Sequence, residues 1–239
     1  MNSITYLYTE VLWRPLFNGL VWFYTTLPWQ DLGLAIIVLT LVIRLILSPL
    51  FLKMQKSQRD LAVLQPEIEK VQNQHKNNKG AQGKALMELY AEKKVNPFGG
   101  CLIILIQLPL LIALFQVFQK GFDPAQLSYL YSFVKNPGAL NPVSFGLVDL
   151  SKGNLFFGVI AALSQFLQTK LSTAQAAPQP PAQGDFAKIL RWQTLYLFPA
   201  LIIIWSSSLP SALALYWTVL NTFGIIQETI MRRVWNKNV

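Results

Sequence analysis

Residues 192–227 form a run of 36 residues without a single charge. Three more stretches, 32–52, 95–119 and 153–169, are apolar and carry between them one charge, Arg44. A helix of about 20 apolar residues crosses the hydrocarbon core of a bilayer. The longest run exceeds one span, and the serines and proline of residues 206–211 are typical of a tight turn within it. We therefore predict an all-α membrane protein with five transmembrane helices.

Composition excludes most soluble classes of protein. Apolar residues make up 53% of the chain and charged residues only 13%, whereas soluble domains carry roughly 25% charged residues. This leaves too little polar surface for a soluble enzyme, a disordered chain or a nucleic-acid-binding module. Cys101 and His75 are the single cysteine and the single histidine, which excludes an internal disulfide and a histidine-cluster metal site.

The expected segments follow from the apolar runs. Along the chain they are an outer interfacial amphipathic helix (1–30), a first span (31–53), a cytoplasmic helical hairpin (54–95), a second span (96–120), an outer loop (121–152), a third span (153–171), a cytoplasmic loop (172–191), a fourth span (192–209), a fifth span (211–230) and a cytoplasmic tail (231–239). Glu10, Arg14 and Asn18 among the aromatic residues of 4–29 favour a helix lying on the membrane surface. An uncleaved membrane anchor is the alternative. Pro66 should kink or restart the first arm of the hairpin, and residues 77–83 should separate its two arms.

The basic residues predict the orientation. Fifteen of the twenty Lys and Arg residues fall in residues 53–94, in residues 170–191 and in the tail, and four fall in the opposite segments. Because basic loops stay in the cytoplasm, we expect the N-terminus outside and the C-terminus inside. The net charge of +9 therefore indicates the orientation of the chain in the membrane and not the binding of nucleic acid. The N-terminal residues do not read as a transit peptide, which favours a bacterial plasma (inner) membrane.

Arg44 lies well inside the first predicted span. Inserting Arg at a helix centre costs roughly 2.5–3.5 kcal/mol, and Glu228, at a cytoplasmic end, is the only acidic residue in the other spans. Arg44 either snorkels and is satisfied by carbonyl and hydroxyl groups, or it lines a hydrated cavity and attracts an acidic group of another molecule. An unpaired cation within the membrane favours the second interpretation.

Polar residues at similar depth support a cavity. Thr40 lies one turn before Arg44 on the same face, and the other predicted spans supply Gln107, Gln165, Gln168, Tyr216 and Asn221. Singly, such residues are more often interhelical hydrogen-bonding groups. No nucleophile and base assemble, and no glycine-rich phosphate loop precedes a lysine, so we expect no enzyme activity and no cofactor.

Several short motifs give the chain a family resemblance. They are TLVIR (40–44), LQPEI (64–68), LY (89–90), VNPFGGC (95–101), LIQLP (105–109), PSALALYW (210–217) and Asn221. In this order and at these distances they make the chain similar, over nearly its whole length, to the YidC/Oxa/Alb family of membrane-protein insertases. The large outer domain of many Gram-negative members is missing, so the chain resembles the short bacterial form.

The resemblance implies five core helices around a groove open to the cytoplasm and to lipid but closed on the outer side. It implies that this groove binds substrate through these residues: Arg44, Thr40, Gln107, Gln165, Gln168, Tyr216, Trp217 and Asn221. The implied partners are nascent membrane proteins and the lipid bilayer, with the ribosome and the Sec translocon as further candidates. No binding of nucleic acid is expected.

Two other functions use the same residues. A small-solute transporter or channel would need polar residues up to the outer ends of several spans, whereas the polar set lies from mid-depth towards the cytoplasm. An assembly chaperone would hold helices that are already inserted. The sequence predicts the insertase and keeps these as its alternatives.

Overall fold

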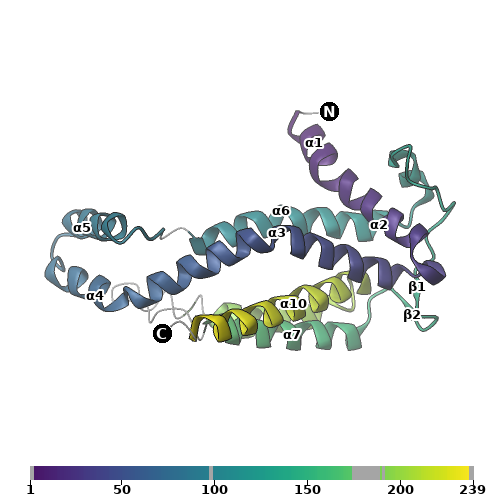
Figure 1. The fold of residues 1–239 in the computed structure, drawn as a ribbon. Coiled ribbons are helices and arrows are strands. Elements are labelled where there is room, and N and C mark those ends of the chain that lie inside the picture. The colour runs from purple at the N-terminus through teal and green to yellow at the C-terminus, as the bar shows by residue number, and fades with distance from the viewer. Residues whose placement is uncertain (1–2, 97–98, 174–188, 190–191, 237–239) are drawn as a thin grey trace.

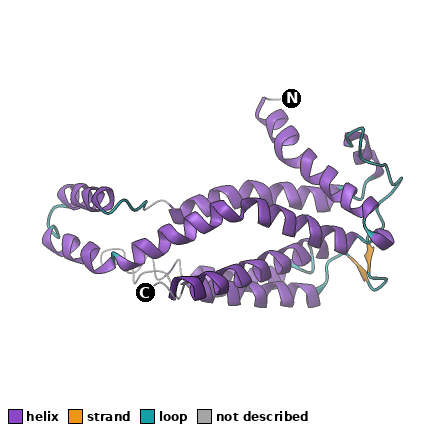
Figure 2. Cartoon of the chain, viewed as in Figure 1, coloured by secondary structure: helices purple, strands orange, loops and turns teal. Residues whose placement is uncertain are grey.

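The structure is a computed structural model, and it describes residues 3–96, 99–173, 189 and 192–236. Helices dominate it, and within the described residues the strands are β1 (Val143–Ser144) and β2 (Val148–Asp149), a short antiparallel hairpin (Figure 2). The helices are α1 (Ser3–Tyr8), α2 (Arg14–Thr26), α3 (Leu32–Val63), α4 (Gln65–Gln74), α5 (Lys79–Glu92), α6 (Gly99–Lys120), α7 (Leu155–Thr173), α9 (Phe198–Trp205) and α10 (Ser211–Asn236). Thr9–Trp13 and Gln193–Leu197 are π-helical, and Pro28–Gln30 and Pro124–Tyr129 are 3-10 turns.

Helix boundaries differ from the predicted segments at the hairpin. α3 continues to Val63, ten residues beyond the first predicted span, because its charged residues are also good helix formers. α4 then begins at Gln65 with Pro66 in its first turn, where proline needs no hydrogen-bond donor, as expected of a restart. The break between the arms is shorter than predicted, since Asn78 caps α5 and Gly80 already lies inside that helix. Most of the predicted cytoplasmic loop (172–191) lies outside the described residues.

The core helices form a long bundle. α3 runs the length of the molecule beside α6, while α7 and α10 lie together opposite them (Figure 1). The α4–α5 hairpin projects from one end, and the β1–β2 hairpin and α2 lie at the other. α9 precedes α10 through the serine-rich turn that the sequence predicted.

Two apolar clusters hold the bundle together. Near the β-hairpin end, Phe17 and Val21 of α2 are fully buried with Ile36 of α3 and Leu114 of α6. A second cluster joins α7, α9 and α10 through Ala161, Ala162, Ile202 and Ala214. Small side chains let membrane helices approach closely, which is where van der Waals packing stabilises them.

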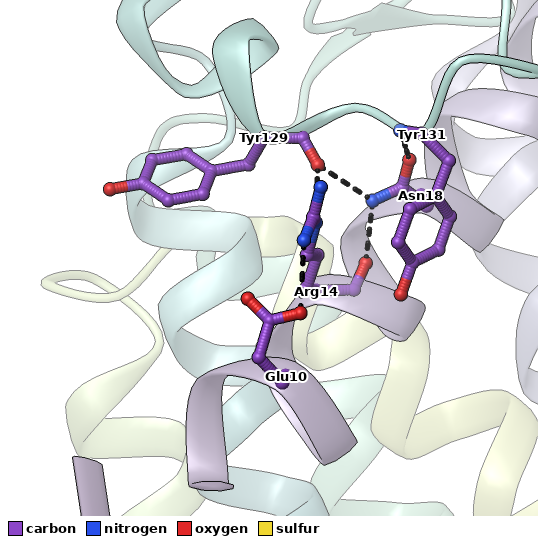
Figure 3. A network of polar contacts seen from close by, with 5 residues as sticks. All are labelled: Glu10, Arg14, Asn18, Tyr129 and Tyr131. Carbon is purple, nitrogen blue, oxygen red and sulfur yellow. Dashed lines mark hydrogen bonds and ion pairs between the residues drawn. The ribbon is translucent and has the colours of Figure 1, made fainter. Parts of the chain in front are cut away.

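The N-terminal helix is fixed to the loop that follows α6. Its polar residues recur at four-residue spacing and meet the backbone of that loop (Figure 3). Arg14 Nε donates to the Tyr129 carbonyl (3.0 Å) and its guanidinium pairs with Glu10 (2.9 Å). Asn18 Nδ2 also donates to that carbonyl (3.1 Å), and Asn18 Oδ1 accepts from the Tyr131 amide (2.6 Å). These side chains therefore form their hydrogen bonds and ion pair within the protein. The predicted placement of the helix on the membrane surface stays a prediction.

Two of the described helices, Leu32–Val63 and Leu155–Ser172, are long and apolar enough to cross a membrane. The apolar segments Leu105–Lys120 and Gln193–Trp205 are shorter. The fold is thus that of a mostly helical protein with two candidate membrane-spanning helices among its described residues, and the count of five spans remains a prediction.

Candidate functional site

Arg44 is buried at the middle of the bundle. Its side chain is 7% exposed, and its guanidinium stacks over the ring of Phe51, two turns further along α3, at 4.7 Å. Its Nε has no hydrogen-bond partner, and no acidic group among the described residues forms an ion pair with it. A stacked aromatic ring attracts a cation by about 0.5–2 kcal/mol. This contact does not use the hydrogen-bond donors of Arg44, which stay available.

The guanidinium lines a cavity of about 430 Å³ between α3, α6, α7 and α10. Apolar side chains such as Phe51, Leu108 and Trp217 form much of the wall, and amide side chains are interspersed among them. The remaining lining residues are Gln55, Gln58, Gln107, Leu111, Gln165, Gln168, Ser172, Phe198, Leu220, Asn221, Gly224 and Gln227.

Six of the eight predicted site residues line this cavity: Arg44, Gln107, Gln165, Gln168, Trp217 and Asn221. Thr40 does not, because its hydroxyl donates to the carbonyl of Ile36 within α3 (2.6 Å) and its side chain is buried. Tyr216 lies behind the wall, where its hydroxyl accepts a hydrogen bond from Gln107 Nε2 (2.9 Å). The structure thus brings together residues from four helices, and their part in binding substrate stays a prediction.

Hydrogen bonds orient several of these amides. Asn221 Nδ2 donates to the Ser164 hydroxyl (3.1 Å), which ties α10 to α7. Gln165 Nε2 donates to the Thr169 hydroxyl (3.1 Å) on its own helix. Gln168 packs against Gly224, where a Cβ would lie 2.4 Å from Gln168 Nε2. The glycine therefore leaves room for an amide at the cavity wall.

Sequence reasoning missed the polar residues nearer the α4–α5 hairpin, namely Gln55, Gln58, Ser172 and Gln227. The signal that could have found them is helical spacing: 44, 51, 55 and 58 share one face of α3, and 165, 168 and 172 share one face of α7. Ending the first span near Lys53 hid this continuation of the stripe.

An acidic side chain with its own partners lies at the end of the cavity nearer the α4–α5 hairpin. Glu228 is buried, and it accepts hydrogen bonds from the Ser172 hydroxyl (2.7 Å) and from Arg232 (3.3 Å). Arg232 also donates to the carbonyl of Leu171. Because its charge is already paired there, Glu228 offers no counter-ion to Arg44.

The arrangement of this cavity suits the binding of a charged group. Within the described residues no group of histidine, cysteine and acidic side chains could hold a metal ion. A cation surrounded by amides and apolar walls favours an acidic group, because charges interact more strongly where the local dielectric is low. The fold and this cavity are those of a mostly helical protein with two candidate membrane spans and a cavity of amides and apolar side chains among its helices.

Comparison with known proteins supplies the family. The 60Kd inner membrane protein family matches residues 22–238, so the chain belongs to that family. It is 37% identical over 200 residues to the membrane protein insertase YidC of Fusobacterium nucleatum, covering 83% of this chain and 84% of that protein. It is 36% identical over 203 residues to YidC of Francisella tularensis subsp. novicida, of which it covers 32%.

Proposed function

We propose that this protein is a membrane protein insertase, which moves nascent membrane proteins into the bilayer. The observation that carries the proposal is Arg44, a buried cation without an acidic partner among the described residues, on the wall of a cavity lined by amides. The relatives named as membrane protein insertases support it. No nucleotide or cofactor is required by the mechanism below.

The proposed mechanism lowers the cost of bringing a hydrophilic segment into the membrane. A short acidic outer segment of the substrate enters the cavity from the hairpin end, where the amide side chains solvate its backbone. Arg44 attracts its carboxylates, and the apolar segment that follows leaves sideways into lipid. Burial of about 20 apolar residues in the bilayer then drives release of the substrate.

The proposed arrangement has five spans, the N-terminus outside and the α4–α5 hairpin in the cytoplasm, in a bacterial plasma membrane. The distribution of basic residues supports it, since nine lie in residues 53–94. The ribosome and the Sec translocon are candidate partners at the hairpin end and beside the bundle, respectively. The eight predicted site residues, with Thr40 and Tyr216 acting through the cavity wall, are the proposed substrate groove.

The packing of the bundle disfavours a channel or solute transporter. Between Arg44 and the β-hairpin end, the interior is filled by Ile36, Leu32 and Val117, all buried. Such side chains give an ion or polar solute no hydrogen-bonding partner along its path. A cavity with one polar end fits an insertase better.

The test replaces Arg44 and varies the charge of the substrate. R44A should abolish insertion of a single-spanning protein with an acidic outer segment, whereas R44K, which keeps the charge, should largely preserve insertion. The same substrate with its acidic residues changed to amides should depend far less on Arg44. Insertion is measured by protease protection in proteoliposomes with equal amounts of each variant. Equal insertion of the acidic substrate by R44A would contradict the proposal.

A further inference from the structure

The β1–β2 hairpin presents an apolar tip. A tight turn joins the strands, with the Leu147 amide donating to the Ser144 carbonyl (3.0 Å) and Phe145 and Gly146 at its centre. Phe145 is 62% exposed and Leu147 is 85% exposed. Two large apolar side chains are thus mostly exposed at the tip of a two-stranded hairpin.

The backbone of this turn makes the phenylalanine more unusual. Phe145 has φ +52° and Gly146 has φ +66°, both in the left-handed region of the backbone. Asn, Asp and Gly adopt this conformation readily, while a bulky residue there is strained by an amount on the order of 1 kcal/mol. The hairpin thus keeps an exposed aromatic side chain where a polar residue would fit the turn better.

The tip is held in a fixed position on the bundle. The Ser144 hydroxyl donates to Asp31 Oδ1 (2.7 Å), and the Phe145 amide donates to the other oxygen of the same carboxylate. The Gly33 amide in turn donates to Ser144 Oγ (3.1 Å). Asp31 also caps α3 through the Leu34 amide (2.8 Å), so the tip is clamped to the first turn of a candidate membrane span.

Behind the tip lies an apolar pocket of about 280 Å³, lined by Phe145, Leu147, Phe156, Phe157 and Leu215 among others. Phe156 belongs to the exposed apolar face of α7, which continues along that candidate span through Val159 and Leu163. The pocket is therefore continuous with a surface that faces lipid when α7 crosses the membrane.

We propose that the hairpin tip and the pocket behind it form a binding site for a phospholipid of the outer leaflet. The tip lies at the level of the headgroups, where amphipathic and aromatic side chains gather, and an acyl chain enters the pocket beside α7. The site would fix the outer end of α3 and α7 relative to the bilayer. It rests on the proposed membrane arrangement, but not on the insertase activity or on Arg44.

The first measurement places a fluorophore at the tip. Cys101 is changed to Ser, and a single cysteine from Leu147→Cys or, as control, from Ala139→Cys, an exposed residue of the same loop, carries an NBD label. In vesicles of phosphatidylcholine and phosphatidylglycerol, 5-doxyl phosphatidylcholine should quench the label at 147 at least threefold more than at 139. Iodide in the outer solution should quench in the opposite order. Equal exposure of both labels to iodide, or no lipid quenching at 147, overturns the proposal.

The second measurement addresses the pocket. A phosphatidylcholine with a diazirine at the end of its acyl chain should label peptides containing residues 155–157. Val148→Trp, which fills the pocket, should reduce this labelling at least fivefold, whereas Val143→Trp, on the neighbouring strand and outside the pocket lining, should leave it unchanged. Labelling that is unaffected by V148W overturns the proposal. R44A should change neither readout, so failure of this site and failure of the insertase proposal are distinguishable.

Discussion

Arg44 is the residue on which the proposed binding of an acidic segment depends. If α3 crosses the membrane as proposed, placing an arginine near the centre of the span costs roughly 2.5–3.5 kcal/mol, and stacking on Phe51 offsets only about 0.5–2 kcal/mol of that. The residual cost fits the amide side chains that the surrounding helices place among the apolar residues of the cavity wall. A bound carboxylate would offset the rest, which is the attraction that the proposed mechanism uses.

Close packing at a single glycine makes a prediction about stability. A Cβ at Gly158 of α7 would lie 2.1 Å from Ser206 Oγ and 2.2 Å from Ser206 Cβ. Ser206 cannot retreat, because its hydroxyl donates to the Ile203 carbonyl (2.6 Å) and its own carbonyl accepts from Asn154 (3.0 Å). G158A should therefore destabilise the bundle by about 1–3 kcal/mol.

The measurement is thermal unfolding in detergent, followed by tryptophan fluorescence. The matched control is G83A, because nothing lies within 4 Å of a Cβ at that position of α5. An alanine there should be neutral or stabilising by up to about 1 kcal/mol. Indistinguishable midpoints for the two variants would show that α7 and the turn before α10 do not pack as described.

At the scale of elements, the α4–α5 hairpin is held by a small apolar seam. Leu64, Ile68 and Leu89 are buried together, whereas the ion pair between Lys93 and Glu67 (2.8 Å) is exposed. The hydrogen bond to Glu67 raises the pKa of Lys93, so the contribution of the Lys93 charge to stability is fully present below the unfolded pKa of Lys and is lost as pH rises through the raised folded pKa. Exposed ion pairs contribute little to stability, so we expect the apolar seam to supply most of the stability of the hairpin.

Removing one seam residue should open the hairpin. L89A should cost about 2–3 kcal/mol locally, and faster amide hydrogen exchange should appear over residues 64–92 while α3, α6 and α10 keep their protection. M87A, on an exposed face of the same helix, should leave exchange unchanged. Equal exchange in both variants would mean that the arms do not depend on the seam, and a change across the whole bundle would mean that hairpin and bundle unfold together.

Local sequence patterns predicted which helices and turns form better than they predicted where the helices end. Pro66 marked the restart at α4 and the serine-rich turn marked the break before α10, because both act through the backbone next to them. The length of α3 was not predictable from hydropathy, since Lys53 ends the predicted span without ending the helix. The clamp between Asp31 and Ser144 joins residues 113 positions apart, and no local pattern encodes it.

The site was partly predictable for the same reason. Helical spacing places polar residues on one face of their helix, and six of the predicted residues line one cavity. Thr40 and Tyr216 did not, because a threonine can bond its own helix backbone and a tyrosine can satisfy its hydroxyl behind the wall. Which partner a polar side chain chooses depends on the packing of several helices, which one sequence does not specify.

At the scale of the whole molecule, the two ends of the bundle differ in charge. The α4–α5 hairpin and the β1–β2 hairpin lie at opposite ends (Figure 1), and residues 53–94, which include the α4–α5 hairpin, hold nine of the twenty basic residues. In a C101S background, H75C should react with an impermeant maleimide only from the cytoplasmic side, and A139C only from the outside. Intact spheroplasts and inverted vesicles distinguish the sides. Labelling of both cysteines from one side would contradict the proposed topology.

The most direct test of the central claim asks whether a substrate occupies the cavity. A photo-crosslinking amino acid replaces Gln168, on the cavity wall, or Leu163, on the exposed face of the same helix. A ribosome-stalled substrate is halted with its acidic outer segment just synthesised. We predict crosslinks between that segment and position 168, weak or absent crosslinks from 163, and loss of the crosslink in R44A. Equal crosslinking from both positions, or a crosslink at 168 that does not need Arg44, would contradict the account.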